Sequence, residues 1–245
     1  MKRFLFFALL VAVFTGCTRQ PKQVSLISEQ MLAIDATRDA VADTAYLQHL
    51  QPINDELNAQ LDVVIGYAPE ALTVHKPECN MLNWASDALY DMACKVYDGQ
   101  VDVAIVNMGG MRCEWQAGDL TRRAIYELMP FDNELVILTL TGQDILDLCD
   151  IFAFQGGQGV SRQLRMQMKN QKARNVLLDG KKIVPQAVYY VATSDYLSTG
   201  ADHFTPLARY QQMIRTDRKI RDLYMDYVVE KKTIASTVDG RMTQL

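Results

Sequence analysis

The chain has 245 residues, of which 49% are hydrophobic and 22% are charged, and this ordinary composition excludes a disordered, collagen-like or disulfide-dense scaffold. The length suffices for one large domain or two small ones, and we expect one. The net charge of −4 and the dispersal of Lys and Arg along the chain argue against a nucleic-acid partner, and three scattered histidines argue against a His-rich metal centre.

The first sixteen residues predict a lipoprotein signal peptide. Lys2 and Arg3 precede an apolar run over residues 4–14, which suits a secretory signal and is too short to span ~30 Å of hydrocarbon. Two small residues then precede Cys17, so the segment resembles a bacterial lipobox, in which cleavage leaves that cysteine as a lipidated first residue. We therefore expect a lipid-anchored protein of the bacterial cell envelope, periplasmic or at the surface, with a formal charge of −6 once residues 1–16 are removed. The alternative is an uncleaved apolar segment that anchors the chain.

Residues 17–44 form the lipidated cysteine and a lead-in, in which the alternation over Val24–Ile34 allows a short strand or a pair of strands. From Asp43, apolar residues every three or four positions predict an amphipathic helix that ends near Asp62. A buried strand is expected directly after it. A second helix is expected over residues 80–97, where apolar residues again share one face.

The next element is a buried strand at Val101–Val106. The glycines that follow it end the strand, so a loop is expected over residues 107–112. Thr121 and Thr141 are expected to cap two helices, the second of which runs to Phe154. The remaining expected elements are a strand at residues 135–140, a flexible glycine loop at 156–159, strands at 164–169, 175–178 and 188–193, a hairpin turn at Asp179-Gly180 and a closing helix at 217–232.

Helices and strands are intermixed without strict alternation, and the run from residue 164 to 193 suggests antiparallel pairing. This order predicts an α+β fold, a layered mixed-sheet domain over residues 45–245. Besides Cys17 the chain has four cysteines, so disulfides are possible in an oxidising compartment but are not implied. Three of these lie in apolar helical surroundings and are expected to be small buried hydrophobes, namely Cys79, Cys94 and Cys149, and the fourth is Cys113.

Three segments combine loop-forming residues with groups that suit a planar, polar ligand. In the first, Asn107 is followed by Gly109 and Gly110, which let the backbone approach a ligand, and by Arg112, a charged donor for carboxylate or phosphate. The other two segments supply aromatic rings, amides and carboxylates, namely Phe131 with Asn133, and Tyr196 with Asp202. Two rings from different loops could sandwich a nucleobase, although either ring taken singly is more often a core residue.

Five motifs occur in the order and spacing of one known family: residues 107–112, 117–121, 130–133, 140–142 and 196–202. Together they resemble the carboxy-terminal domain of the 5′-nucleotidase family, over roughly residues 45–245. The resemblance implies a layered mixed-sheet fold that forms the substrate-specificity half of such enzymes. It also implies a nucleoside or nucleotide ligand.

By this resemblance Phe131 and Tyr196 would stack on the base, Asn133 would bind its edge and Asp202 the ribose. Tyr196 stands where phenylalanine is common in the family. The remaining contacts would come from Asn107, Gly109, Gly110, Arg112 and Gly159, with His75 in the place of a family arginine, which reduces the family's arginine cluster.

The family's hydrolysis is done by an amino-terminal metallophosphatase domain, and its motifs are absent from this sequence. We therefore expect no catalytic or metal-binding residues and no cofactor here, with divalent metals only in a separate metallophosphatase partner. The leading hypothesis is the nucleotide-binding specificity half of a 5′-nucleotidase. The alternative is a non-catalytic lipoprotein that captures nucleosides or nucleotides for scavenging. Catalysis by this chain alone would need a nucleophile and a base, but the Ser and His residues of the sequence form no recognisable catalytic motif.

Overall fold

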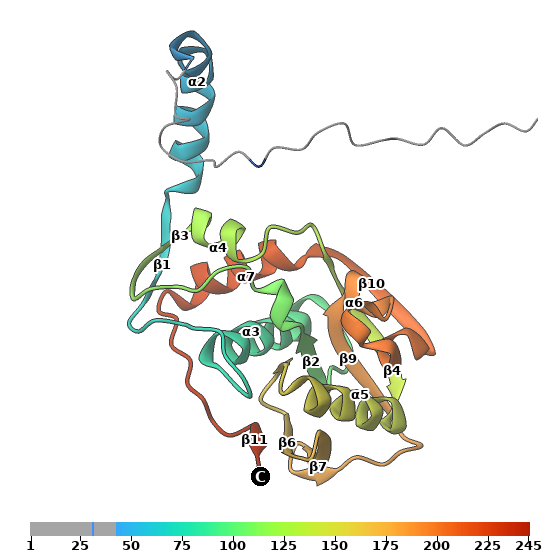
Figure 1. Cartoon of the computed structure of the whole chain (residues 1–245). Helices are drawn as coiled ribbons and strands as arrows, with labels where there is room; N and C mark the ends of the chain where they lie inside the picture. The colour runs from blue at the N-terminus through green and yellow to red at the C-terminus, as the bar shows by residue number, and fades with distance from the viewer. Residues whose placement is uncertain (1–30, 32–42) are drawn as a thin grey trace, which may run out of the picture. The chain divides into compact units, whose positions relative to one another are not determined.

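The computed structural model describes Met31 and residues 43–245 (Figure 1). The expected signal peptide, Cys17 and, apart from Met31, the strand expected at Val24–Ile34 lie outside the described residues. The helices are α2 (Thr44–Leu61), α3 (Asn80–Val96), α4 (Arg122–Leu128), α5 (Gly142–Gln155), α6 (Asp195–Ser198) and α7 (Ile220–Lys231). The strands are β1 (Val64–Ala68), β2 (Val103–Val106), β3 (Gly118–Thr121), β4 (Glu134–Thr141), β5 (Gly159–Val160), β6 (Leu164–Lys169), β7 (Lys172–Leu178), β8 (Lys181–Lys182), β9 (Val188–Ser194), β10 (Gln212–Lys219) and β11 (Met242–Gln244).

The central element is a mixed five-stranded sheet with the order β10-β4-β9-β2-β5. Strand β2 runs parallel to β9, whereas β4 pairs with β9 in the antiparallel sense and β10 pairs with β4 likewise. This arrangement confirms the expected α+β class with a mixed sheet.

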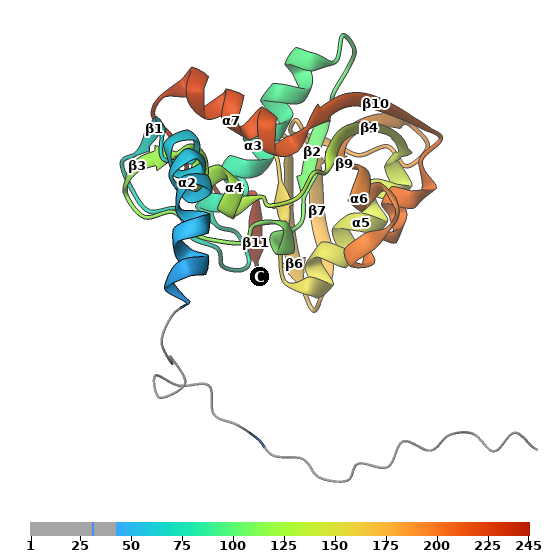
Figure 2. The same ribbon diagram turned by 90° about the horizontal axis from the view of Figure 1, so that it is seen from above.

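Side chains of this sheet alternate between two separate hydrophobic cores. In β2, Ala104 and Val106 join the core built with α3 and α7, whereas Val103 and Ile105 join the core built with α5. Figure 2 shows α3 and α7 on one side of the sheet and α5 on the other. The β-branched run is therefore buried on both faces, which explains why it reads as a continuous apolar stretch.

A second sheet has the order β11-β6-β7-β8, and α5 packs against β7. The hairpin turn between β7 and β8 is Asp179-Gly180, as expected. Both residues have positive φ values, 48° and 74°, which is the requirement of a two-residue type I′ turn.

Both expected threonine caps are confirmed. Thr121 Oγ1 accepts a hydrogen bond from the Ala124 N–H at the start of α4. Thr141 and Asp144 form a reciprocal capping box at the start of α5, and Gly156 ends that helix in the left-handed conformation.

The helix expected from Asp43 to about Asp62 is confirmed as α2. The boundary between two units of the chain, residues 1–50 and 51–245, falls within this helix. In residues 51–61 no side chain is buried, and Ile53 and Leu57 are 59% and 48% exposed. The burial that the apolar spacing predicts is therefore not found in this part of the helix. Neither α2 nor any other described helix is long and apolar enough to cross a membrane.

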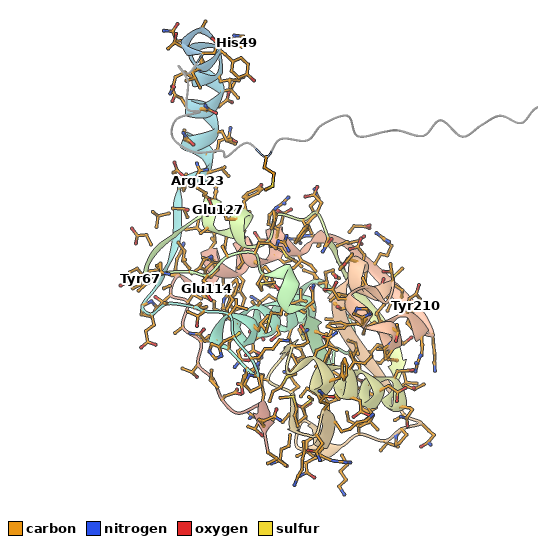
Figure 3. All side chains as sticks on the ribbon, viewed as in Figure 1. His49, Tyr67, Glu114, Arg123, Glu127 and Tyr210 are labelled. Atoms are coloured by element: carbon orange, nitrogen blue, oxygen red, sulfur yellow. The ribbon has the colours of Figure 1, made fainter. Side chains whose placement is uncertain are left out.

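The end of α2 is tied to α4 by Arg123, which Figure 3 labels. Its Nε donates to Asp62 Oδ1 at 2.6 Å, and its Nη2 donates to Asn58 Oδ1 at 2.7 Å. These contacts join the entry of β1 to the short helix that follows β3.

Three expected boundaries are corrected. Strand β7 begins at Lys172 rather than at residue 175, and residues 217–219 belong to β10 rather than to the closing helix. The glycine segment 156–159 is not a loop throughout, because Gly159 belongs to β5 and pairs with Val106 of β2. Strand β10, which the sequence did not predict, alternates poorly because most of its residues are exposed or half-buried.

The cysteines Cys79, Cys94, Cys113 and Cys149 are all free thiols in the described structure. Cys79 and Cys149 are buried as expected, and burial raises the pKa of the Cys149 thiol to about 12. Cys94 is exposed, so its expected burial is wrong. It lies one residue beyond Ala93, the last buried position of α3.

Residues 162–182 carry seven Lys and Arg residues against one Asp, so the expectation of dispersed basic residues is wrong for this segment. The segment forms β6, β7 and β8, where the strands bring these cations together. Three of them are paired with carboxylates, Arg162 with Asp91 at 2.6 Å, Lys172 with Asp150 at 3.0 Å and Arg165 with Asp239 at 3.4 Å. The absence of a nucleic-acid partner stays a prediction.

Candidate functional site

A pocket of about 270 Å³ lies where three loops meet at one edge of the central sheet. Because β2 and β9 are parallel, the loops that follow them leave at the same edge. Strand β4 is antiparallel to β9, with Leu135 opposite Ser194, so the loop that precedes β4 arrives there too. The pocket is lined by Asn107, Gly109, Gly110, Arg112, Phe131, Asn133, Tyr196 and Asp202. These are eight of the ten binding residues expected from the sequence, and their ligand contacts remain predictions.

The loop after β2 folds tightly around its glycines. A Cβ atom at Gly110 would lie 2.7 Å from Asn107 Oδ1, so a side chain at this position would force the asparagine to move. Arg112 Nη1 donates to the Gly109 carbonyl at 3.1 Å, which holds the arginine against its own loop. The glycines therefore leave the mouth of the pocket open beside a fixed cation.

The aromatic wall of the pocket is Phe131, whose ring lies under the guanidinium of Arg112 at 5.5 Å from the ring centre. This distance is within the range of a cation–π contact. Phe131 is half-buried and packs against the core on the α3 side. Tyr196, the second expected stacking residue, is 45% exposed, so nearly half of its surface is accessible to a ligand.

Asp202 is held in the pocket by hydrogen bonds to both of its carboxylate oxygens. Its backbone has a φ of 55°, the left-handed region that few non-glycine residues adopt. One carboxylate oxygen accepts from Asn107 Nδ2, and the other accepts from the Tyr196 hydroxyl at 3.0 Å. The bond to Asp202 raises the pKa of Tyr196, because the protonated phenol is the donor. A carboxylate held from both sides retains lone pairs for further hydroxyl donors.

Two glutamines that the sequence did not predict as site residues, Gln155 and Gln158, form hydrogen bonds with the pocket loops. Gln155 Nε2 donates to the Asp202 carbonyl at 3.0 Å, and Gln158 Nε2 donates to Gln155 Oε1 at 2.7 Å. Gln158 Oε1 also accepts from the Met108 N–H at 2.7 Å. These bonds connect the end of α5 to two of the pocket loops. Nothing in the local sequence marks the glutamines, because their partners lie 47 to 50 residues away.

Gly159 and His75 are not among the residues that line the pocket. Gly159 is buried in β5, where a Cβ atom would lie 2.4 Å from Val106 Cγ2, so strand packing alone requires this glycine. His75 is exposed. Its neighbour Lys76 donates from Nζ to the Gln155 carbonyl, so the Lys76 ammonium group is bound at the end of α5.

His203 follows Asp202 but lines a different and wider cavity of about 570 Å³, together with Phe154 and residues of the β6–β7 turn. His203 therefore does not line the pocket that contains Asn107 and Asp202. Within residues 43–245, no group of three or more His, Cys, Asp and Glu side chains is arranged to hold a metal ion.

Comparison with known proteins adds the family context. Residues 63–209 match the family model described as "5′-nucleotidase, C-terminal domain". A 5′-nucleotidase from Vibrio cholerae is 24% identical over 199 residues, which cover 79% of this chain and 35% of that protein. The chain spans about a third of the length of the relatives that it matches.

Solved structures support the same fold. The 5′-nucleotidase precursor from Thermus thermophilus superposes with a TM-score of 0.71 at 26% identity, over 82% of this chain and 42% of that one. The NAD nucleotidase from Haemophilus influenzae superposes with a TM-score of 0.56 at 16% identity, over 82% of this chain and 41% of that one.

Proposed function

The chain belongs to the family of 5′-nucleotidase C-terminal domains, and from this premise we propose that it is the nucleotide-binding half of a 5′-nucleotidase whose phosphatase resides in a separate polypeptide. The observation that carries the proposal is the pocket itself. Three loops far apart in the sequence bring two aromatic rings, two amides, a carboxylate and a guanidinium around one volume of about 270 Å³. This combination suits a nucleoside with a phosphate at its edge.

Each group has a role that follows from its chemistry. Phe131 and Tyr196 offer ring faces to a base, and Asn133 offers a donor and an acceptor to the base edge. Asp202 accepts from ribose hydroxyls, since its carboxylate is already oriented by Asn107 and Tyr196. Arg112 supplies a forked donor for a 5′-phosphate.

Hydrolysis is assigned to the partner, a metallophosphatase in which two divalent metal ions would clamp the attacking and leaving oxygens. In this arrangement the present chain selects and orients the nucleotide. Neither a catalytic residue nor a cofactor is assigned to it.

A second candidate function is the capture of nucleosides without any hydrolase. The distribution of positive charge favours it, because Arg112 is the one cation among the residues that line the pocket. Lys76 is committed to the Gln155 carbonyl, and His75 does not line the pocket. A single arginine suits an uncharged nucleoside as well as a monophosphate.

Phosphate release separates these functions. Residues 18–245, purified and mixed with Mg²⁺, Mn²⁺ or Zn²⁺, should release no phosphate from AMP, yet should bind adenosine and AMP in calorimetric titration. An exported metallophosphatase encoded beside this chain should release phosphate faster when the chain is added. The Arg112→Ala variant is the control, because it should weaken AMP binding more than adenosine binding. Turnover by the chain alone that disappears in Asp202→Asn would contradict the division of labour.

We further propose that the chain is held in the bacterial cell envelope by lipid on Cys17. In the Cys17→Ser variant the protein should move from the membrane fraction to the soluble fraction or should accumulate uncleaved, because the acyl chains are the proposed anchor. Fractionation followed by immunoblotting measures this, with Cys94→Ser as the control thiol. Normal processing and membrane fractionation of Cys17→Ser would show that the lipobox interpretation is wrong.

A further inference from the structure

The loop that carries Phe131 and Asn133 is held by three consecutive residues at the junction of β10 and α7. Lys219 Nζ donates to Asp132 Oδ2 at 2.9 Å, and Arg221 Nη2 donates to Asp132 Oδ1 at 2.6 Å. Between them, the Ile220 N–H donates to the Asn133 carbonyl at 2.9 Å. Asp132 is thus bound through both carboxylate oxygens, and its two neighbours in sequence are the residues that face the pocket.

Arg221 is itself rigidly placed. It is 9% exposed, and its guanidinium lies over the ring of Tyr126 at 4.4 Å from the ring centre. A second bond, from Nη1 to the Phe131 carbonyl at 3.4 Å, ties it directly to the aromatic residue of the pocket. Its Nε is buried without a partner among the described residues, so the side chain bears a desolvation cost in order to reach this loop.

The charge pattern agrees with this geometry. The hydrogen bonds and charges of Lys219 and then Arg221 lower the pKa of Asp132, as expected for a carboxylate that accepts from two cations. The Asp132 side chain is 65% exposed, and neither Asp132 nor its partners Lys219 and Arg221 line the pocket. The two cations are therefore placed to bind Asp132 and not the ligand.

We infer that Lys219 and Arg221 are positioning residues, which fix the Phe131–Asn133 loop through Asp132 and so hold the pocket's aromatic face and amide ready for a nucleoside. The inference rests on the proposed function for the ligand, but its structural part does not. A loop that is already ordered loses less conformational entropy when a ligand binds. Disrupting the Lys219 or Arg221 contacts therefore lowers affinity without removing any group that touches the ligand.

The first test is adenosine titration of Lys219→Ala and Arg221→Lys. Each variant should bind adenosine about 3- to 20-fold more weakly than the parent at unchanged secondary structure. The matched control is Arg218→Ala, which breaks the neighbouring pair between Arg218 and Asp226 at 2.9 Å and should leave affinity unchanged. In an Asp132→Ala background, Lys219→Ala should have no further effect, because it acts only through Asp132. Equal losses in the control, or additive losses in the double variant, would overturn the inference.

The second test needs no ligand. Hydrogen exchange of the Ile220 amide, which bonds Asn133, and of the Glu134 amide, which bonds Asp195 Oδ1, should be faster in Lys219→Ala and Arg221→Lys than in the parent and in Arg218→Ala. Unchanged exchange would overturn the ordering role, and faster exchange with unchanged adenosine affinity would overturn its link to binding. If the parent does not bind adenosine, the proposed ligand is wrong, and the exchange data still decide whether these residues order the loop.

Discussion

Alanine in place of Phe131 or Tyr196 will weaken adenosine binding by about 1–3 kcal/mol, which corresponds to about a five- to 150-fold rise in Kd. Both rings line the pocket, and a stacked base loses one ring face in either variant. The double variant should show non-additive losses, because a single ring cannot enclose a base. Calorimetric titration with adenosine measures the loss, and thermal melts show whether the variants remain folded.

Two controls separate stacking from other effects. Tyr196→Phe keeps the ring and removes the hydroxyl that bonds Asp202, so its loss should be smaller, about 0.5–1.5 kcal/mol. Phe154→Ala removes an aromatic ring that is 68% exposed and lines the other cavity, so adenosine affinity should not change. If the rings are only packing residues, the alanine variants will lose thermal stability and keep their affinity as long as they stay folded.

Much of the fold could be predicted because its signals are local. The β-branched run that forms β2, the threonine caps of α4 and α5 and the Asp179-Gly180 turn each depend on residues within four positions of one another. The two-faced burial of β2 explains why its strand signal was clear. Strand β10 lacked such a signal because its sequence is mostly polar and its pairing with β4 is supplied by residues more than 70 positions away.

The pocket could be predicted as a set of residue types, but its supporting structure could not. Glycines after a strand and aromatic residues in loops are visible in the sequence, and the parallel pairing of β2 with β9 brings them to one edge. The contacts of Gln155 with Asp202 and of Arg221 with Asp132 join segments 47 and 89 residues apart. Long-range side-chain pairs of this kind have no periodic or motif signature, so only the folded chain reveals them.

At Gly159 the sequence gives a signal, but the signal does not identify its physical cause. A glycine in a glycine-rich stretch suggests close approach to a ligand, yet the Val106 side chain leaves no room for a Cβ atom at this position. The same sequence signal therefore has two physical causes, and strand packing accounts for this one. Gly110 differs, because it lines the pocket and contacts Asn107, whose amide bonds Asp202.

The largest loss of stability is expected for Arg241→Met. The Arg241 side chain is 4% exposed and makes five hydrogen bonds: two to Asp87, two to Asp239 and one to the Val160 carbonyl, at 2.9–3.1 Å. Glu78, also buried, accepts from the backbone N–H groups of Asp239 and Met242, so the C-terminal segment is fastened to α3 through this cluster. Methionine fills a similar volume but removes all five hydrogen bonds and the buried cation that Asp87, Asp239 and Glu78 share. The cations that remain beside Asp87 and Asp239 are the more exposed Arg162 and Arg165.

Removing one partner of a buried ion pair costs about 3–5 kcal/mol, so the Tm of Arg241→Met should fall by roughly 6–20 °C for a domain of this size. The matched control is Arg162→Met, which also removes an arginine beside Asp87. Arg162 bonds Asp91 at 2.6 Å, but its side chain is 45% exposed. The Tm of this variant should change by only a few degrees, because exposed pairs contribute about 0–1 kcal/mol.

The pH dependence gives an independent check on the same contacts. Burial by itself would raise the pKa of Asp239, but the hydrogen bonds and charge of Arg241 lower it below the ordinary value. A carboxylate with a lowered pKa in the folded state contributes stability above its unfolded pKa of about 4 and loses that contribution as the pH falls further. The Tm difference between the parent and Arg241→Met should therefore be largest near neutral pH and should shrink below about pH 4. A difference that stays constant from pH 7 to pH 3, or a Tm within the range of Arg162→Met, would contradict the role of this ion cluster.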